Sequence, residues 1–256
     1  MYFSLMIKVV FLGFGNVNQQ LCRSLQKSDH VDVLQIYNRN SQVFSSEWKG
    51  FDFTTQLSEI KSADIYIVGI TDDAIASFSE TIPFRDRLVV HTSGSVSLKA
   101  LSNHNKRGVF YPLQTFTKTQ SVNFTNIPIC IEAENASDLK LLHQLGSLLS
   151  ENVTEVSSEA REKVHLAAVF VNNFVNHLYH ISEELLTEHE LDFKLLQPLI
   201  AETARKIKTL SPAEAQTGPA KRNDHKTIEN HLHLLEGSPY IELYKMLTIS
   251  IQEQFK

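Results

Sequence analysis

Two glycines near the start of the chain have the spacing needed to approach a phosphate group. They follow an apolar run, Lys8–Leu12, as Gly13 and Gly15, and a helical pattern begins directly after them. In such a turn the first glycine allows a sharp reversal, and the second lets the backbone approach a pyrophosphate at the helix N-terminus. We therefore expect a dinucleotide to bind at five consecutive residues: Gly13, Phe14, Gly15, Asn16 and Val17.

The third position of this glycine pattern holds Asn18 instead of a small residue. Because glycine or alanine at that position allows the helix to pack closely on the strand, we expect looser packing here. A domain that has kept the turn but lost its ligand is the alternative.

The residues after a second apolar run, Val31–Tyr37, indicate which dinucleotide binds. NAD sites place Asp or Glu here to bond the ribose 2′-hydroxyl, and this chain has no carboxylate between Asn38 and Ser41. Arg39 is suited to pair with a 2′-phosphate, to which Asn38 and Ser41 can donate hydrogen bonds. The sequence therefore favours NADP over NAD, with an ordinary surface arginine as the alternative.

Two further polar clusters follow short apolar runs. Thr71 and Asp72 come after one run, and His91 and Ser93 come at the end of another. Ligands of open parallel sheets bind beyond the carboxyl ends of the strands, so we expect Thr71 and Asp72 to line the cofactor site. His91 is a candidate proton donor or substrate ligand, with Ser93 orienting the reacting group; a turn histidine without chemical function is the alternative.

A long helical pattern later in the chain carries polar residues on one face. At about 100° per residue, His165, Asn172 and Asn176 fall within a few tens of degrees of one another on an otherwise apolar helix. Asparagine is a poor helix former and buried amides need partners, so we expect this stripe to face a polar cleft or a ligand. A hydrogen-bonded seam between helices, or a dimer contact, is the alternative.

Two basic residues stand just before another predicted helix. Lys221 and Arg222 precede Asp224, which is expected to cap that helix. The macrodipole disfavours positive charge at a helix N-terminus, so we expect a substrate carboxylate or a cofactor phosphate to bind there. A solvated basic turn is the alternative.

These residues are positioned by two contrasting halves of the chain. Short apolar runs alternate with helical patterns up to about residue 155, whereas long helical patterns, including one from Ser158 to Glu188, take over afterwards. The sequence predicts an α/β fold: a Rossmann-like, doubly wound, mainly parallel sheet in residues 1–156, then an all-α substrate and dimerisation domain in residues 157–256. Strands are expected at residues 8–12, 31–37, 64–70, 87–91, 108–111 and 127–131, with weaker ones at 51–54 and 152–155.

The bulk composition excludes several classes of protein. The 256 residues carry a formal net charge of −5 without a basic stripe, so nucleic acid and membranes are not expected partners. Two cysteines without metal spacing fit a reduced cytoplasmic protein, and the histidines lack the companions of a metal site. The apolar start of the chain is interrupted by Lys8 and lacks a cleavage site, so we expect a buried strand there instead of a signal peptide.

Four motifs together resemble one protein family. They are Gly13–Val17, HTSGS at 91–95, YPLQTF at 111–116 and TGPAKRND at 217–224. Over essentially the whole chain, the sequence is similar to Rossmann-like proteins with a domain of unknown function, DUF2520, which are often labelled NADP oxidoreductases. Those proteins resemble the pyrroline-5-carboxylate reductase, F420-dependent NADP oxidoreductase and 6-phosphogluconate dehydrogenase-like group. In related hydroxyacid dehydrogenases the corresponding helix brings a lysine to the substrate, and this chain offers His165 instead.

The residues and the resemblance together predict an oxidoreductase. It would transfer a hydride between NADPH and a small carbonyl or imine substrate that carries a carboxylate or another anion. His165 or His91 would deliver the proton, Asn172 would help to orient the reacting group, and Lys221 or Arg222 would hold the carboxylate.

A non-catalytic nucleotide-sensing or scaffold protein of the same fold is the alternative function. Asn18 in the glycine pattern and the missing lysine motivate it. The last helical pattern, from Ile241 to Phe255, is more apolar than a small domain needs, so we expect a homodimer that forms through the helical domain.

Overall fold

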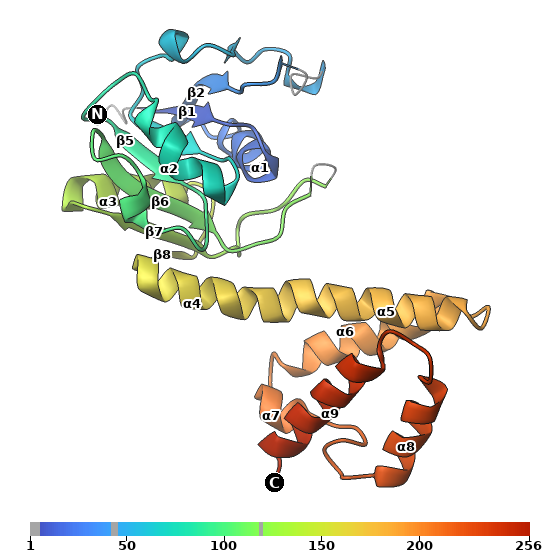
Figure 1. Ribbon diagram of the computed structural model, residues 1–256. Helices are drawn as coiled ribbons and strands as arrows, with labels where there is room; N and C mark the ends of the chain where they lie inside the picture. Colours follow the sequence, from blue (N-terminus) through green and yellow to red (C-terminus); the bar gives the residue numbers. More distant parts are fainter. Residues whose placement is uncertain (1–5, 42–45, 118–119) are drawn as a thin grey trace. The chain divides into compact units, whose positions relative to one another are not determined.

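The computed structural model describes residues 6–41, 46–117 and 120–256, and the chain divides into two compact units (Figure 1). The first unit comprises residues 1–172 and the second residues 173–256. The expected boundary after residue 156 falls between the last strand and the first long helix, whereas the compact units divide after Asn172. Helix α4 (Ser158–Ala168) therefore belongs to the unit that contains the sheet.

In its described residues, the first unit contains one eight-stranded sheet with the order β3-β2-β1-β4-β5-β6-β7-β8. Each neighbouring pair is parallel except β6 and β7, which are antiparallel. The fold-class prediction, a mainly parallel sheet followed by a helical region, is confirmed. The strands are β1 (Ile7–Leu12), β2 (Val31–Tyr37), β3 (Phe53–Thr54), β4 (Ile65–Val68), β5 (Leu88–His91), β6 (Lys106–Pro112), β7 (Ile129–Ala133) and β8 (Val153–Glu155).

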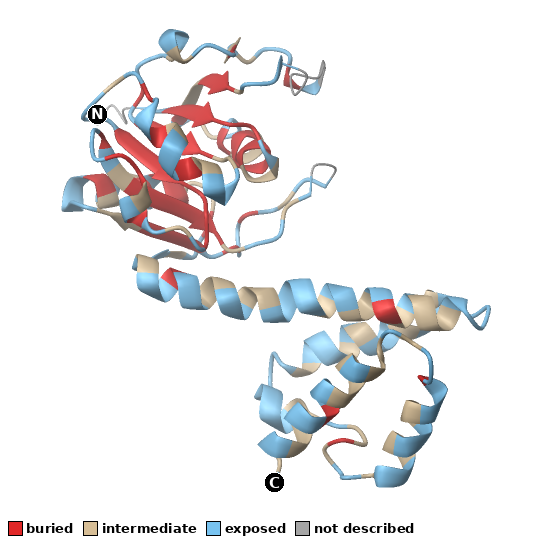
Figure 2. Cartoon of the chain, in the orientation of Figure 1, coloured by how far each residue is buried: buried red, intermediate tan, exposed pale blue. Residues whose placement is uncertain are grey.

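Neighbouring residues of the central strands are buried on opposite faces of the sheet. Val9 and Phe11 belong to one apolar cluster, whereas Val10 and Leu12 belong to another. Because side chains alternate along a strand, a strand covered on both faces is apolar at nearly every position. Figure 2 shows that the central strands are buried along most of their length. Helices α1 (Asn16–Leu25) and α3 (Ala136–Ser147) cover the first face, and α2 (Asp72–Glu80) covers the second.

The order of the strands places a ligand site at one edge of this sheet. Successive strands run outward from β1 in one direction to β3, and from β4 in the other direction to β8. Ligands of such sheets bind beyond the carboxyl ends of the strands where the order reverses, which here is between β1 and β4. Gly13 follows β1 and Gly69 follows β4, so the predicted phosphate turn lies at this point.

The first unit also contains three short 3-10 helices among its described residues: η2 (Ser46–Trp48), η3 (Leu57–Glu59) and η4 (Leu98–Ala100).

A wider helical turn interrupts the long helix predicted over residues 158–188. Segment η5 (Val169–Phe174) is a π-helix between α4 and α5 (Val175–Thr187). A π-helix bonds each residue to the fifth one along, so it rotates less per residue than an α-helix. The rotation that placed His165, Asn172 and Asn176 on one face therefore does not hold across η5, and the expectation of a single stripe is corrected.

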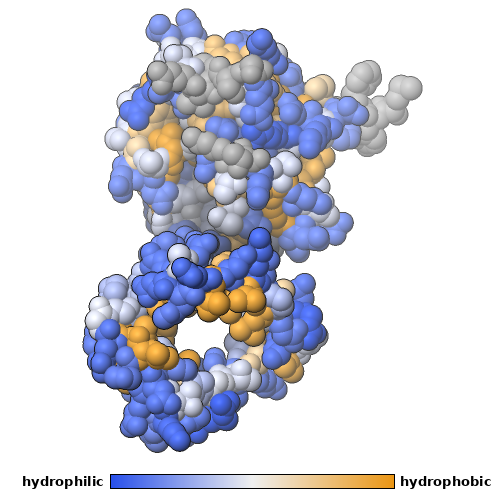
Figure 3. Space-filling model, turned by 90° about the vertical axis from the view of Figure 1, so that its right-hand side faces the viewer, coloured by the Kyte–Doolittle hydropathy of each residue, from blue (hydrophilic) through white to orange (hydrophobic). Residues whose placement is uncertain are grey.

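The second unit consists of helices with few buried apolar residues. Among its described residues, only Ile181, Ala220 and Leu235 are both apolar and buried. Figure 3 shows apolar side chains gathered around an opening between these helices. No helix in the described parts of the chain is long and apolar enough to cross a lipid bilayer. The remaining helices are η6 (Phe193–Leu196), α6 (Gln197–Lys206), α7 (Pro212–Ala215), α8 (His225–Leu234) and α9 (Ile241–Gln254).

Candidate active site

The turn after β1 requires its first glycine. Gly13 has a φ of +84°, and a Cβ atom there would lie 2.4 Å from Cγ2 of Ile70 and 2.8 Å from the carbonyl oxygen of Gly69. Another residue would be strained and would collide with the segment after β4. Gly15 is the N-cap of α1, and within the described residues no side chain caps this helix and no acidic residue lies in its first turn. The N-terminus of α1 is therefore suited to a phosphate group.

Asn18 fastens this turn to the sheet. Its Nδ2 atom donates hydrogen bonds to the carbonyl oxygens of Gly13 (2.7 Å) and Ile67 (3.1 Å), and the residue is fully buried. A Cβ atom at Gly69 would lie 2.3 Å from Cγ of Asn18, so the missing side chain at Gly69 provides the space for the amide. The structure contradicts the looser packing that we expected from an asparagine at this position.

Asn38 shapes the loop after β2 through both ends of its amide. Its Oδ1 atom accepts a hydrogen bond from the backbone N–H of Phe14 (3.2 Å), and its Nδ2 atom donates to the carbonyl oxygen of Asn40 (2.8 Å). The side chain thus links the phosphate turn to the loop that carries Arg39. Ser41, the other predicted phosphate ligand in this loop, is exposed.

A cavity of about 420 Å³ lies where this loop meets α2. Arg39 lines it together with Gly13, Ser77 and Thr81. Its apolar walls suit an adenine ring, and the guanidinium suits a phosphate on the neighbouring ribose. The residues present therefore fit the adenosine half of NADP. The apolar lining consists of Tyr37, Leu57, Ile70, Ala74 and Phe78.

The first turn of α2 is tied to the turn after β5. Thr71 is the N-cap of α2, and Oδ2 of Asp72 accepts a hydrogen bond of 2.7 Å from Oγ of Ser95. Thr71 and Asp72 are exposed at the carboxyl edge of the sheet, where they were expected to line the cofactor site. The bond from Ser95 gives Asp72 a second function, because it holds two edge loops together.

His91 is enclosed in the first unit. The residue has no exposed surface, and its Nδ1 atom accepts a hydrogen bond of 3.2 Å from the backbone N–H of Ser93. Burial lowers the pKa of His91 to about 4, and the positive charge of Arg161 acts in the same direction. A neutral, enclosed imidazole favours the alternative raised from the sequence, a structural turn histidine.

Ser93 also stabilises this turn. Its Oγ atom accepts hydrogen bonds from the backbone N–H groups of Ser95 (3.2 Å) and Val96 (3.1 Å). The hydroxyl oxygen of Ser93 is thus bonded to the backbone of its own turn. The assignment of Ser93 as a substrate-orienting group stays a prediction.

Tyr111 and His165 form a hydrogen-bonded pair in the same unit. Oη of Tyr111, at the carboxyl end of β6, lies 3.1 Å from Nδ1 of His165 on α4, and the two rings meet edge to face. Gly94 lies against both rings: a Cβ atom there would be 2.5 Å from Nδ1 of His165 and 2.8 Å from Cζ of Tyr111. His165 is only partly buried. Tyr111 was not among the predicted site residues, although its position at the end of an apolar run is typical of the edge of a sheet.

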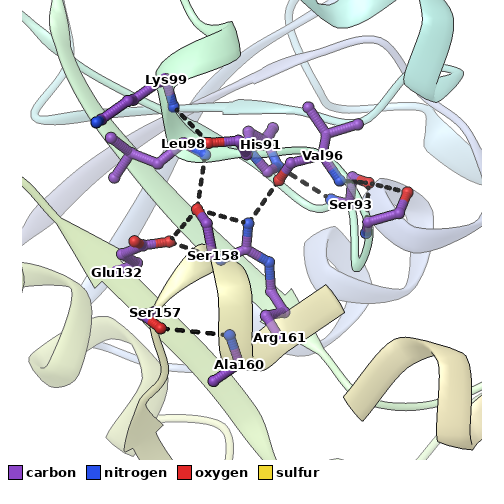
Figure 4. Close-up of polar contacts among 12 residues, drawn as sticks. His91, Ser93, Val96, Leu98, Lys99, Glu132, Ser157, Ser158, Ala160 and Arg161 are labelled. Carbon is purple, nitrogen blue, oxygen red and sulfur yellow. Dashed lines mark hydrogen bonds and ion pairs between the residues drawn. The ribbon is translucent and has the colours of Figure 1, made fainter. Parts of the chain in front are cut away.

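A buried ion pair holds α4 against the sheet (Figure 4). Arg161 is completely buried, and its Nη1 atom donates a hydrogen bond of 2.7 Å to Oε2 of Glu132 on β7. Its Nη2 atom donates to the carbonyl oxygen of Val96 (2.5 Å) and to Oγ of Ser158 (3.2 Å). Since Arg161 lies one helical turn before His165, this network fixes the helix from which His165 projects. This network was not predicted from the sequence, in which the carboxylate of Glu132 within an apolar strand was the available signal.

The predicted polar residues after His165 are exposed. Asn172 lies in η5 at the end of the first unit, and Asn176 lies in the second unit. Their assignment to the site stays a prediction.

Lys221 is engaged in contacts within the second unit. Its Nζ atom donates hydrogen bonds to the carbonyl oxygens of Gln216 (2.8 Å) and Ala213 (3.3 Å), and it lies 4.5 Å from the ring centroid of Phe255. These contacts account for one of the two positive charges before α8 without a bound anion. Arg222 is exposed. In the described residues, no group of three or more His, Cys, Asp or Glu side chains is arranged to hold a metal ion.

A parallel sheet with a Gly-x-Gly turn at its point of reversal, followed by a helical unit, is an architecture of NAD(P)-dependent oxidoreductases. The family model described as "Domain of unknown function (DUF2520)" matches residues 127–251. The structure of "putative NADP oxidoreductase BF3122" from Bacteroides fragilis is 38% identical, with a TM-score of 0.89 over 97% of this chain and 98% of that one. The chain belongs to the DUF2520 family.

More distant structures share the fold. A 1-pyrroline-5-carboxylate reductase from Streptococcus pyogenes is 12% identical, with a TM-score of 0.63 over 98% of each chain. A reductive aminase from Aspergillus terreus in complex with NADPH and ethyl levulinate is 12% identical, with a TM-score of 0.70 over 97% of this chain and 93% of that one. The comparison with curated proteins found no match.

Proposed function

We propose that the protein is an NADP-dependent oxidoreductase that reduces a small carbonyl or imine compound. The observation that supports this most strongly is that one compact unit carries both a partly apolar cavity beside the glycine turn and a hydrogen-bonded tyrosine–histidine pair. The cavity is lined by Gly13 and Arg39, and the pair consists of Tyr111 and His165. The NADPH complex of a reductive aminase with the same fold is in keeping with this proposal.

Arg39 and the turn at Gly13 would hold the cofactor. The turn offers backbone N–H groups to the pyrophosphate, and the guanidinium pairs with the 2′-phosphate. When bound, NADPH supplies a hydride for the carbon of a C=O or C=N bond and becomes NADP⁺.

His165 would supply the proton that this reduction also requires. As the substrate carbon gains the hydride, its oxygen or nitrogen accepts a proton from the imidazole, which is afterwards reprotonated from water. His91 is less suited to this step, because it has no exposed surface that a substrate could reach.

Titration with NADPH and NADH, followed by nicotinamide fluorescence, tests the cofactor assignment. Arg39→Met is expected to weaken NADPH binding roughly ten- to hundredfold and to leave NADH binding unchanged, because only NADPH carries the 2′-phosphate. Arg85→Met, which removes an exposed arginine away from the cavity, is the matched control. No binding of either nucleotide at millimolar concentration would overturn the proposal.

A panel of ketoacids and cyclic imines tests the reaction. Turnover that falls in His165→Ala, while NADPH binding is retained, supports the oxidoreductase. Cofactor binding without any turnover, unchanged in His165→Ala, would support the alternative of a non-catalytic nucleotide sensor.

We further propose that the helical unit pairs with a second copy of this chain. Leu199, Leu234 and Met246 are each more than 60% exposed, and the unit buries few apolar residues of its own. A unit that buries so few apolar residues gains stability from a permanent partner, and permanent interfaces resemble a core cut in half. A second copy of the same chain would cover these apolar side chains and is always present in equal amount.

Sedimentation equilibrium tests this pairing. The expected mass is twice the 29.1 kDa of one chain. Leu199→Glu should lower it towards a single chain, whereas Lys208→Glu, at an exposed polar position, should not. A monomer at micromolar concentration would contradict the pairing.

A further inference from the structure

The contact between Tyr111 and His165 is built by three separate segments of the first unit. Tyr111 comes from β6, His165 from α4, and Gly94 from the turn after β5. The ring centroids are 6.1 Å apart with an interplanar angle of 73°, and Oη lies 3.1 Å from Nδ1. Gly94 makes this approach possible, since any side chain there would occupy the space of both rings.

The phenol of Tyr111 has a proton that it can donate in this pair. Burial raises the pKa of Tyr111, Cys130 and Asp72 act in the same direction, and Arg161 opposes them. The phenol therefore keeps its proton at neutral pH and can donate it in a hydrogen bond. A neutral imidazole has one N–H donor and one acceptor nitrogen.

We infer that Tyr111 is the positioning residue for His165: by donating to Nδ1 it holds the ring proton on Nε2 and fixes the orientation of the ring. This inference rests on the proposed function, in which His165 delivers a proton to the substrate. Nε2, the ring nitrogen that is not bonded to Tyr111, then carries the proton that is transferred to the substrate. Without Tyr111 the imidazole would exchange between its two neutral forms and would rotate away from this orientation.

The helical unit provides a matched control for this pair. Oη of Tyr244 lies 2.8 Å from Nδ1 of His231, and these two rings also meet edge to face. Tyr244→Phe therefore removes the same kind of hydrogen bond from a histidine to which no function is assigned.

Nitrogen-15 NMR of the histidine side chains tests the inference directly. The signals of His165 are assigned by their loss in His165→Gln. In the unaltered protein the Nε2–H form is expected to dominate, and Tyr111→Phe is expected to raise the share of the Nδ1–H form roughly two- to tenfold, the effect of losing one hydrogen bond. Tyr244→Phe should change the signals of His231 and leave those of His165 unaltered. An unchanged proton distribution on His165 in Tyr111→Phe would overturn the inference.

A second variant reaches the same contact from another segment. Gly94→Ala leaves both rings chemically intact but obstructs their approach, so it should shift the proton distribution on His165 in the same direction. An unchanged distribution in this variant as well would count against the inference even if Tyr111→Phe failed to fold.

Turnover measurements separate this inference from the proposed function. With a substrate that the protein turns over, Tyr111→Phe should lower kcat, while the dissociation constant of NADPH stays the same. The NMR result does not depend on any turnover: absence of turnover overturns the proposed reaction, whereas an unchanged proton distribution overturns the positioning by Tyr111.

Discussion

The amide of Asn18 occupies the space that a side chain at Gly69 would need. A Cβ atom at Gly69 would lie 2.3 Å from Cγ and 2.4 Å from Nδ2 of Asn18. The usual small residue in the third position of the glycine pattern is thus replaced by a polar one, and the small residue stands on the neighbouring strand end instead. Helix α1 and the sheet stay in close contact because the missing side chain is now at Gly69, after β4, and no longer at the third position of the glycine pattern in α1.

This relationship predicts coupled effects on stability. Gly69→Ala forces the amide out of its position, so we expect the free energy of unfolding to fall by about 1–3 kcal/mol. Asn18→Ala leaves the buried carbonyl oxygens of Gly13 and Ile67 without this donor and is expected to have an effect of similar size, about 1–3 kcal/mol. The double variant should lose less than the sum, because removing the amide of Asn18 leaves room for the methyl group added in Gly69→Ala. Urea unfolding of the four proteins measures the coupling, and strictly additive losses would contradict it.

The ion pair between Arg161 and Glu132 should be important for stability. Arg161→Met leaves the carboxylate of Glu132 without its buried partner, so we expect the free energy of unfolding to fall by about 3 kcal/mol or more. Arg107→Met removes a second arginine–glutamate pair, with Glu134, in which both side chains are more exposed. Its expected effect is about 1 kcal/mol or less. Urea unfolding measures both free energies. Equal losses in the two variants would show that burial does not determine how much such a pair contributes to stability.

The eight strands could be predicted because the signal for each is local. Runs such as Val9–Leu12 are apolar at consecutive positions, as a strand covered on both faces must be. The phosphate turn could be predicted for the same reason, since strand, glycines and helix are adjacent in the sequence. The fold class follows from these local signals together with the purely helical patterns after residue 157.

The contacts that organise the candidate site could not be predicted in this way. Tyr111 and His165 are 54 residues apart, and Arg161 and Glu132 are 29 apart, so no local pattern pairs them. His91 looked accessible because it ends a strand, but the turn beyond that strand folds over its ring. The π turn at Val169–Phe174 carries no glycine or proline that would mark it in the sequence.

Stability should depend on pH through His91. An unfolded histidine titrates near pH 6.5, whereas the pKa of His91 in the folded protein is about 4, chiefly because of burial. Between these values the unfolded chain binds more protons, so acid favours unfolding, and about 3 kcal/mol of stability should be lost as the pH falls from 6.5 to 4. In His91→Gln this contribution should disappear, whereas His104→Gln, at an exposed position, should retain it. Urea unfolding across this pH range measures the difference, and parallel curves for the protein and His91→Gln would contradict the assignment.

Gly94 should matter for reaction and not for cofactor binding. An added methyl group would lie 2.5 Å from Nδ1 of His165, so the ring must move, and small displacements of a proton donor can lower turnover by roughly tenfold to a hundredfold. Gly94 does not line the cavity beside Arg39, so the dissociation constant of NADPH should stay unchanged in Gly94→Ala. Gly146→Ala, a glycine substitution in α3 against Val153, controls for a general loss of stability. If Gly94→Ala turned over substrate at the full rate while binding NADPH normally, the position of the His165 ring would not limit the reaction, and the proton would have to come from another group.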